Sequence, residues 1–176
     1  MLKVSETACE YQIDPLGIDS RKPRLFWKTE SDGEKQTWYR VIVASSEAEL
    51  LRGTGDLYDT GVVSSASDFY AEYRGQALTS RRKCYWKVFV GYEGGTAESG
   101  VSFFETGLDA DDWKGTWMSM PVNNQGGTTL YRKIISVKEK EFTRVRAYVC
   151  GIGCCEVFCN GVKTDDAVLD PPITEY

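Results

Sequence analysis

Polar and apolar residues alternate with a period of two in several short stretches of the first 107 residues. In residues 38–44, Tyr39, Val41 and Val43 would share one face of a strand, and the residues between them would share the other. In residues 84–90, every second side chain from Cys84 onward is apolar. Shorter runs with strand character are residues 9–13, 25–30, 61–63, 68–73 and 100–106, with turn residues between them. About seven short strands of this kind are typical of an antiparallel β-sandwich, so residues 1–107 predict an all-β domain.

Helix signals are scarce in this chain. Ser46 can cap a helix, and Glu49 follows it at the spacing of a capping box. Gly53 comes soon afterwards, so we expect a helix of one or two turns.

A polar, turn-prone stretch at residues 108–113 breaks the pattern and reads as a linker. Further strand-like runs follow at residues 116–120, 129–137, 143–151 and 154–158, and Asn160-Gly161 suits a hairpin turn. We therefore predict a second β-domain over residues 108–176. This segment is short for a sandwich that covers both of its sheets, so we expect it to be the start of a truncated domain.

Composition and charge exclude several functions. The sequence has no histidine, so it has no Ser-His or Cys-His nucleophile pair. Its net charge is −5, which argues against a nucleic-acid partner because phosphate backbones need a basic surface. Apolar runs are too short to span a membrane, and the first residues lack the apolar core of a signal peptide. We therefore expect a cytoplasmic protein with no membrane partner and no cofactor.

Four of the six cysteines, Cys150, Cys154, Cys155 and Cys159, fall within ten residues. Their spacing lacks the C-x₂-C pairs of common zinc sites. Free cysteine is among the most often buried residue types. We therefore expect reduced thiols that act as small core residues, and no metal site.

Carboxylates and tryptophans are the other candidate functional residues. The pairs Asp111-Asp112 and Asp165-Asp166 are interpreted as solvated loop acids, because adjacent side chains point apart and no apolar pocket is indicated. Trp27 and Trp86 lie in strand patterns and are expected in the core.

Trp113 and Trp117 lie four residues apart at the start of the second segment. They are the candidate sugar-binding residues, since an exposed aromatic side chain often marks a binding surface. The alternative is that they pack at the joint between the two domains. No catalytic residue is predicted in the chain.

Several short strings occur in the order and spacing found in one enzyme family. They are DPLGID at 14–19, KPRLFW at 22–27, YRVIVAS at 39–45, DTGVVS at 59–64, YWKV at 85–88, DWKGTW at 112–117, YRK at 131–133, VFCNG at 157–161 and LDP at 169–171. Together they resemble the N-terminal region of bacterial α-L-rhamnosidases of glycoside hydrolase family 78.

The resemblance implies a fibronectin-III-like or immunoglobulin-like β-sandwich followed by the start of a jelly-roll-like domain. In such enzymes the hydrolysis of terminal α-L-rhamnosides takes place in a later (α/α)₆ barrel, whose acidic motifs do not occur in these residues. The implied partners are that barrel and rhamnose-containing glycans. We also expect a homodimer through the C-terminal half. The alternative is a free-standing carbohydrate-binding or adhesive β-sandwich protein without hydrolase activity.

The sequence departs from the family at Cys84, where relatives tend to place a tyrosine. The hydroxyl of that tyrosine ties down the corner before the next strand. We therefore expect the corner hydrogen bond to be either lost or made by another residue, and Cys84 to be buried.

Overall fold

The computed structural model describes residues 1–66, 70–119, 128–137, 141–166 and 168. The chain divides into two compact units, Met1–Trp117 and Met118–Tyr176. The domain boundary predicted after residue 107 stays a prediction.

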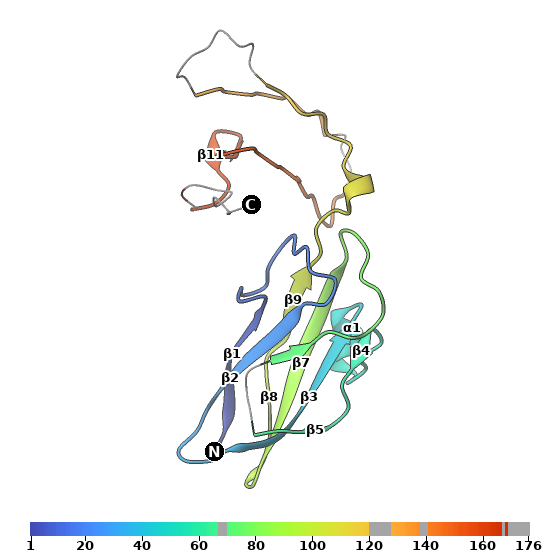
Figure 1. The fold of residues 1–176 in the computed structure, drawn as a ribbon, viewed down its shortest axis with the longest axis vertical. Helices are drawn as coiled ribbons and strands as arrows, with labels where there is room; N and C mark the ends of the chain where they lie inside the picture. The colour runs from blue at the N-terminus through green and yellow to red at the C-terminus, as the bar shows by residue number, and fades with distance from the viewer. Residues whose placement is uncertain (67–69, 120–127, 138–140, 167, 169–176) are drawn as a thin grey trace. The chain divides into compact units, whose positions relative to one another are not determined.

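The first unit is a sandwich of two antiparallel sheets (Figure 1). The smaller sheet has the order β1-β2-β6, formed by Lys3–Cys9, Arg24–Glu30 and Tyr70–Glu72. The larger sheet has the order β4-β3-β7-β8, formed by Tyr58–Asp59, Gln36–Ala44, Lys83–Tyr92 and Gly95–Glu98. In addition, β5 (Val63–Ser64) pairs with β3, and β9 (Ser102–Glu105) pairs with β7. The predicted fold class is therefore confirmed.

The core lies between the sheets, and the predicted alternation fills it. Val41 and Val43 of β3 are fully buried in one cluster with Trp86 and Val88 of β7. Trp27 of β2 enters the same cluster from the other sheet. β-Branched and aromatic residues fit such a pleated, buried surface well. Trp27 and Trp86 are thus core residues, as predicted.

The outer face of the larger sheet is also partly covered. Helix α1 (Glu47–Leu51) begins after Ser46, whose side chain accepts a hydrogen bond from the backbone N–H of Glu49 as predicted. Leu50 of this helix packs with Ile42 and Ala44 on the side of β3 that faces away from the main core. The centre of β3 is therefore buried on both faces.

The first strand differs from its prediction. Residues 9–13 were expected to be extended, but β1 covers Lys3–Cys9 and the chain then turns. Glu10 and Tyr11 have φ values of 48° and 66°, and Cys9 and Gln12 exchange two backbone hydrogen bonds across them. The expected strand is therefore wrong, because positive φ values at two successive residues reverse the chain direction.

The loop between β6 and β7 is flanked by Tyr73 and Cys84. Cys84 is completely buried, as predicted. The hydroxyl of the buried Tyr73, which follows β6, donates to the backbone oxygen of Gln76 at 2.7 Å. It also lies 3.4 Å from the backbone oxygen of Leu57. Tyr73 thus joins the ends of two loops inside the core.

In the second unit, the described residues contain one small hairpin. Phe158–Cys159 (β10) pairs with Val162–Lys163 (β11) around the predicted turn, where Asn160 and Gly161 both have positive φ. The strands predicted at 129–137 and 143–151 do not form, and that at 154–158 is replaced by β10, which starts at Phe158. The prediction at 116–120 fails for its described residues 116–119. An alternating pattern favours extended backbone, but a strand also needs a paired neighbour.

Candidate functional site

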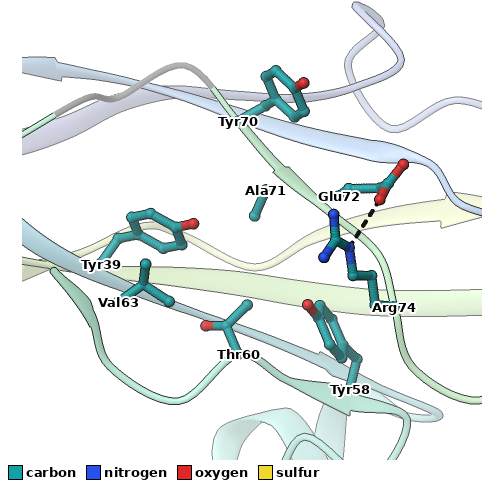
Figure 2. Close-up of a pocket in the computed structure, with 8 residues that line it drawn as sticks. All are labelled: Tyr39, Tyr58, Thr60, Val63, Tyr70, Ala71, Glu72 and Arg74. Atoms are coloured by element: carbon teal, nitrogen blue, oxygen red, sulfur yellow. Dashed lines mark hydrogen bonds and ion pairs between the residues drawn. The ribbon is translucent and has the colours of Figure 1, made fainter. Parts of the chain in front are cut away.

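A groove of about 460 Å³ opens between the two sheets of the first unit. Figure 2 shows its walls: one comes from β3, β4 and β5 of the larger sheet, and the other from β6 and the residues after it. The lining residues are Tyr39, Tyr58, Thr60, Val63, Tyr70, Ala71, Glu72 and Arg74. We refer to this feature as the tyrosine groove.

The groove exists because the strands on this side of the sandwich are short. β4 and β5 have two residues each, and β6 has three. Each pairs with a longer strand on one side: β4 and β5 with β3, and β6 with β2. Ala71 faces inward and is buried, so the floor of the groove is small and apolar at this point. On the opposite wall, the pairing of Tyr39 with Val63 places a second apolar side chain beside Tyr39.

Two tyrosines project polar groups into the groove from rings that are anchored in the core. The ring of Tyr39 lies 4.9 Å from that of Trp27, and the ring of Tyr58 lies 5.2 Å from that of Tyr73. Their hydroxyls point into the space between the walls (Figure 2). Within the described part of the chain, neither hydroxyl has a hydrogen-bond partner. Burial raises the pKa of Tyr58, so its hydroxyl remains a donor at neutral pH.

A third tyrosine forms the rim. Tyr70 is 49% exposed, and its ring lies 5.4 Å from that of Phe26. The ring of Tyr11 lies 4.4 Å from that of Phe26. Tyr70 is therefore held at the end of a row of three aromatic rings on the outer face of the smaller sheet.

The charged groups of the groove neutralise each other. Nε of Arg74 donates to Oε2 of Glu72 at 2.9 Å. This hydrogen bond to the Glu72 carboxylate raises the pKa of Arg74. Glu72 is the one carboxylate among the lining residues. Glycoside hydrolysis generally requires two carboxyl groups about 5–10 Å apart, and the residues that line the groove supply one.

The sequence-predicted sugar-binding residues lie elsewhere. Trp113 follows the short 3₁₀ helix Ala110–Asp112 and is 41% exposed, and Trp117 is 68% exposed. Neither lines the tyrosine groove. Their role in sugar binding stays a prediction.

The carboxylates that the sequence put forward are at the surface. Asp111, Asp165 and Asp166 are exposed, and Asp112 is half-buried. Asp112 lies 3.8 Å from Arg81. None of the four lines the tyrosine groove.

The clustered cysteines correct one expectation. All are free thiols, but Cys150, Cys154 and Cys159 are exposed and Cys155 is half-buried. The prediction that they act as core residues is wrong, because the strands that would have buried them do not form. Across the described ranges, no group of three or more His, Cys, Asp or Glu side chains is placed to hold a metal ion. Nor does any helix there have the length and hydropathy needed to cross a bilayer.

Sequence reasoning missed the tyrosine groove because its residues come from four separate strands. A signal was nevertheless present. Tyr39 occupies an inward-facing position in an alternating strand, where its neighbours Val41 and Val43 are aliphatic. A tyrosine at such a position carries a hydroxyl that needs a polar or wet surrounding, which indicates the edge of a core and not its centre.

The comparison with known protein families gives a clear result. Residues 4–110 match the Rha78A-like, N-terminal immunoglobulin domain. The chain belongs to this family. The resemblance seen in the sequence strings is therefore confirmed, and so is the immunoglobulin-like sandwich that it implied.

Individual relatives carry the name α-L-rhamnosidase. One from Formosa agariphila is 29% identical over 93% of this chain and 20% of its own length. One from Streptomyces avermitilis is 39% identical over 68% of this chain and 12% of its own length. The crystal structure of the Streptomyces avermitilis α-L-rhamnosidase complexed with L-rhamnose superimposes with a TM-score of 0.63 and 36% identity. This similarity covers 69% of this chain and 12% of that chain. The chain thus spans a fifth or less of the length of these relatives.

Proposed function

We propose that this chain serves as a non-catalytic accessory β-domain of an α-L-rhamnosidase. The observation that carries the proposal is the family membership of residues 4–110, together with relatives named α-L-rhamnosidase that match across 93% of the chain. The chemistry would then belong to another part of a longer protein. The groove supports this division, because its single carboxylate is held in an ion pair with Arg74.

The proposal is tested by comparing two proteins on an aryl α-L-rhamnoside such as 4-nitrophenyl α-L-rhamnopyranoside. One is the 176-residue chain, and the other is the product of the whole reading frame from the same gene. We expect turnover by the long protein and none above the buffer blank by the chain. A reading frame that stops after Tyr176 would contradict the proposal and favour a free-standing carbohydrate-binding or adhesive protein. Turnover by the chain that a single carboxylate substitution abolishes would contradict its non-catalytic role.

A second part of the proposal concerns partners of the second unit. Large apolar side chains are exposed along its described residues, among them Ile134, Phe142, Val149 and Ile152. Exposed apolar surface on this scale is unusual for a monomer. We propose that the chain on its own forms a homodimer through its C-terminal half, since a second copy offers the same apolar residues in return. Light scattering should give about twice the 19.8 kDa monomer mass, and the monomer mass at high micromolar concentration would refute dimerisation.

A further inference from the structure

We propose that the tyrosine groove binds one neutral pyranose unit of a glycan. The inference deepens the proposed function and rests on it for the choice of L-rhamnose as the probe. The class of ligand follows from the groove itself, through its hydroxyls, its charge balance and its size.

The hydroxyls indicate a ligand that both donates and accepts hydrogen bonds. Tyr39 and Tyr58 each offer a donor and an acceptor that no described residue uses. Thr60 is different, because its hydroxyl accepts from the backbone N–H of Val41 at 2.9 Å and donates to the oxygen of Gly61 at 2.7 Å. Two free phenolic hydroxyls on rings fixed by core contacts form a preorganised pair. A sugar ring carries several hydroxyls and can satisfy both.

The charge balance indicates a neutral ligand. Arg74 and Glu72 neutralise each other at the mouth of the groove, and the remaining lining residues are uncharged. The exposed nitrogens of Arg74 that do not bind Glu72 can donate to a sugar hydroxyl. An anionic ligand would need an unpaired cation, and the lining residues offer none.

The size and floor of the groove fit one sugar ring. A volume of about 460 Å³ falls within the usual range of small-molecule sites, roughly 300–1,000 Å³. Ala71 on one wall and Val63 on the other supply apolar surface for the C–H groups of the ring. The polar groups of the lining would fix the orientation of the ring, as the few polar groups of a small-molecule site generally do.

The experiment is a titration of the ¹⁵N-labelled 176-residue chain with methyl α-L-rhamnopyranoside, followed by amide shifts in two-dimensional NMR spectra. We expect millimolar affinity and shifts confined to residues around β5, β6 and Thr60. The double variant Tyr39→Phe/Tyr58→Phe keeps both rings and should weaken binding at least tenfold. Tyr85→Phe removes a hydroxyl from the opposite face of the larger sheet and should leave binding unchanged. The dispersion of the spectra shows whether each variant is folded.

Three results would overturn the inference. The first is an absence of shifts up to about 50 mM sugar, a limit that corresponds to negligible affinity. The second is binding that the double variant retains, and the third is tighter binding of methyl glucuronide, an anionic sugar. These outcomes are independent of the hydrolysis assay. Binding to the groove without turnover by the long protein would refute the proposed enzyme alone, and turnover without binding would refute the inference alone.

Discussion

The hydroxyl of Tyr73 offers a sharp test of how the sandwich is held together. Substitution by phenylalanine removes the hydrogen bond to the backbone oxygen of Gln76, which is 2.7 Å long and partly buried. The longer contact to Leu57 oxygen is also lost, but that oxygen still accepts from the backbone N–H of Gln76 at 3.0 Å. The ring itself keeps its edge-on contacts with Tyr58 and Phe104.

The loss of stability expected for Tyr73→Phe follows from one lost hydrogen bond and from the backbone oxygen of Gln76, which is left without that donor. A typical hydrogen bond contributes about 0.5–1.5 kcal/mol net, and a buried acceptor without a partner adds to the loss. We therefore expect Tyr73→Phe to lower the free energy of unfolding of the first unit by about 1–2 kcal/mol. With a urea m-value of about 2 kcal/mol/M, the unfolding midpoint should fall by roughly 0.5–1 M at unchanged slope.

Tyr85→Phe is the matched control, since Tyr85 is only half-buried and its hydroxyl has no partner within the described ranges. Urea unfolding followed by tryptophan fluorescence measures both variants, and the control should stay within about 0.3 kcal/mol of the original chain. A Tyr73→Phe midpoint equal to that of the control would show that the hydroxyl does not join the two loops. A loss above about 3 kcal/mol would show instead that the ring has moved, which the structure does not anticipate.

Three further predictions concern a close contact, pH and the thiols. A Cβ at Gly91 would lie 1.8 Å from Nε1 of Trp38, so Gly91→Ala should lower the free energy of unfolding in urea by about 2 kcal/mol or more. A Cβ at Gly100 meets nothing within 4 Å, so the control Gly100→Ala should leave this free energy unchanged. Equal effects of the two substitutions would refute the contact. Burial raises the pKa of Cys84 to about 11 and that of Tyr73 to about 12. The free energy of unfolding should therefore fall as the pH rises above about 9, where these groups ionise in the unfolded chain but not in the folded one. Cys84→Ala should make this fall less steep between pH 9 and 11. Parallel curves of unfolding free energy against pH for the two proteins would contradict this. Finally, a thiol reagent such as Ellman's should modify the four clustered cysteines in the native chain and reach Cys9 and Cys84 only after unfolding, whereas protection of the cluster would indicate that it is buried after all.

The best predicted parts of the fold are those in which local pattern and long-range pairing agree. β7 alternates along its whole length, and β3 pairs with it from Trp38 to Ala44 in one register. The short helix was recognised because its cap, Ser46, is a local signal that needs no tertiary context. By contrast, β1 was missed because its register shifts between Val4 and Glu6. Such a bulge adds a residue to one strand, so inward-facing positions no longer recur at every second residue.

The candidate site was harder to foresee for a different reason. Its groove depends on how far β4, β5 and β6 extend, and each of these strands has only two or three residues. Strand lengths at a sheet edge are set by pairing between distant segments, which periodicity in one segment does not report. The burial predicted for the clustered cysteines was wrong for a similar reason, since it was inferred from the alternating residues around them. Pattern specifies which face of a strand is apolar, but not whether a second layer covers that face.

The two-sided burial of the centre of β3 has a consequence for how the domain opens. Val41, Ile42, Val43 and Ala44 have no exposed surface at all, since α1 covers the side that the main core does not. β3 pairs with β7 on one side along these residues, and on the other side the backbone N–H of Val41 donates to the hydroxyl oxygen of Thr60. In deuterated solvent the amides of these residues should exchange last, and only when the whole sandwich unfolds, whereas β6, a three-residue edge strand beside the groove, can detach alone. The wall of the groove formed by β6 should therefore open at a lower free energy than the centre of β3.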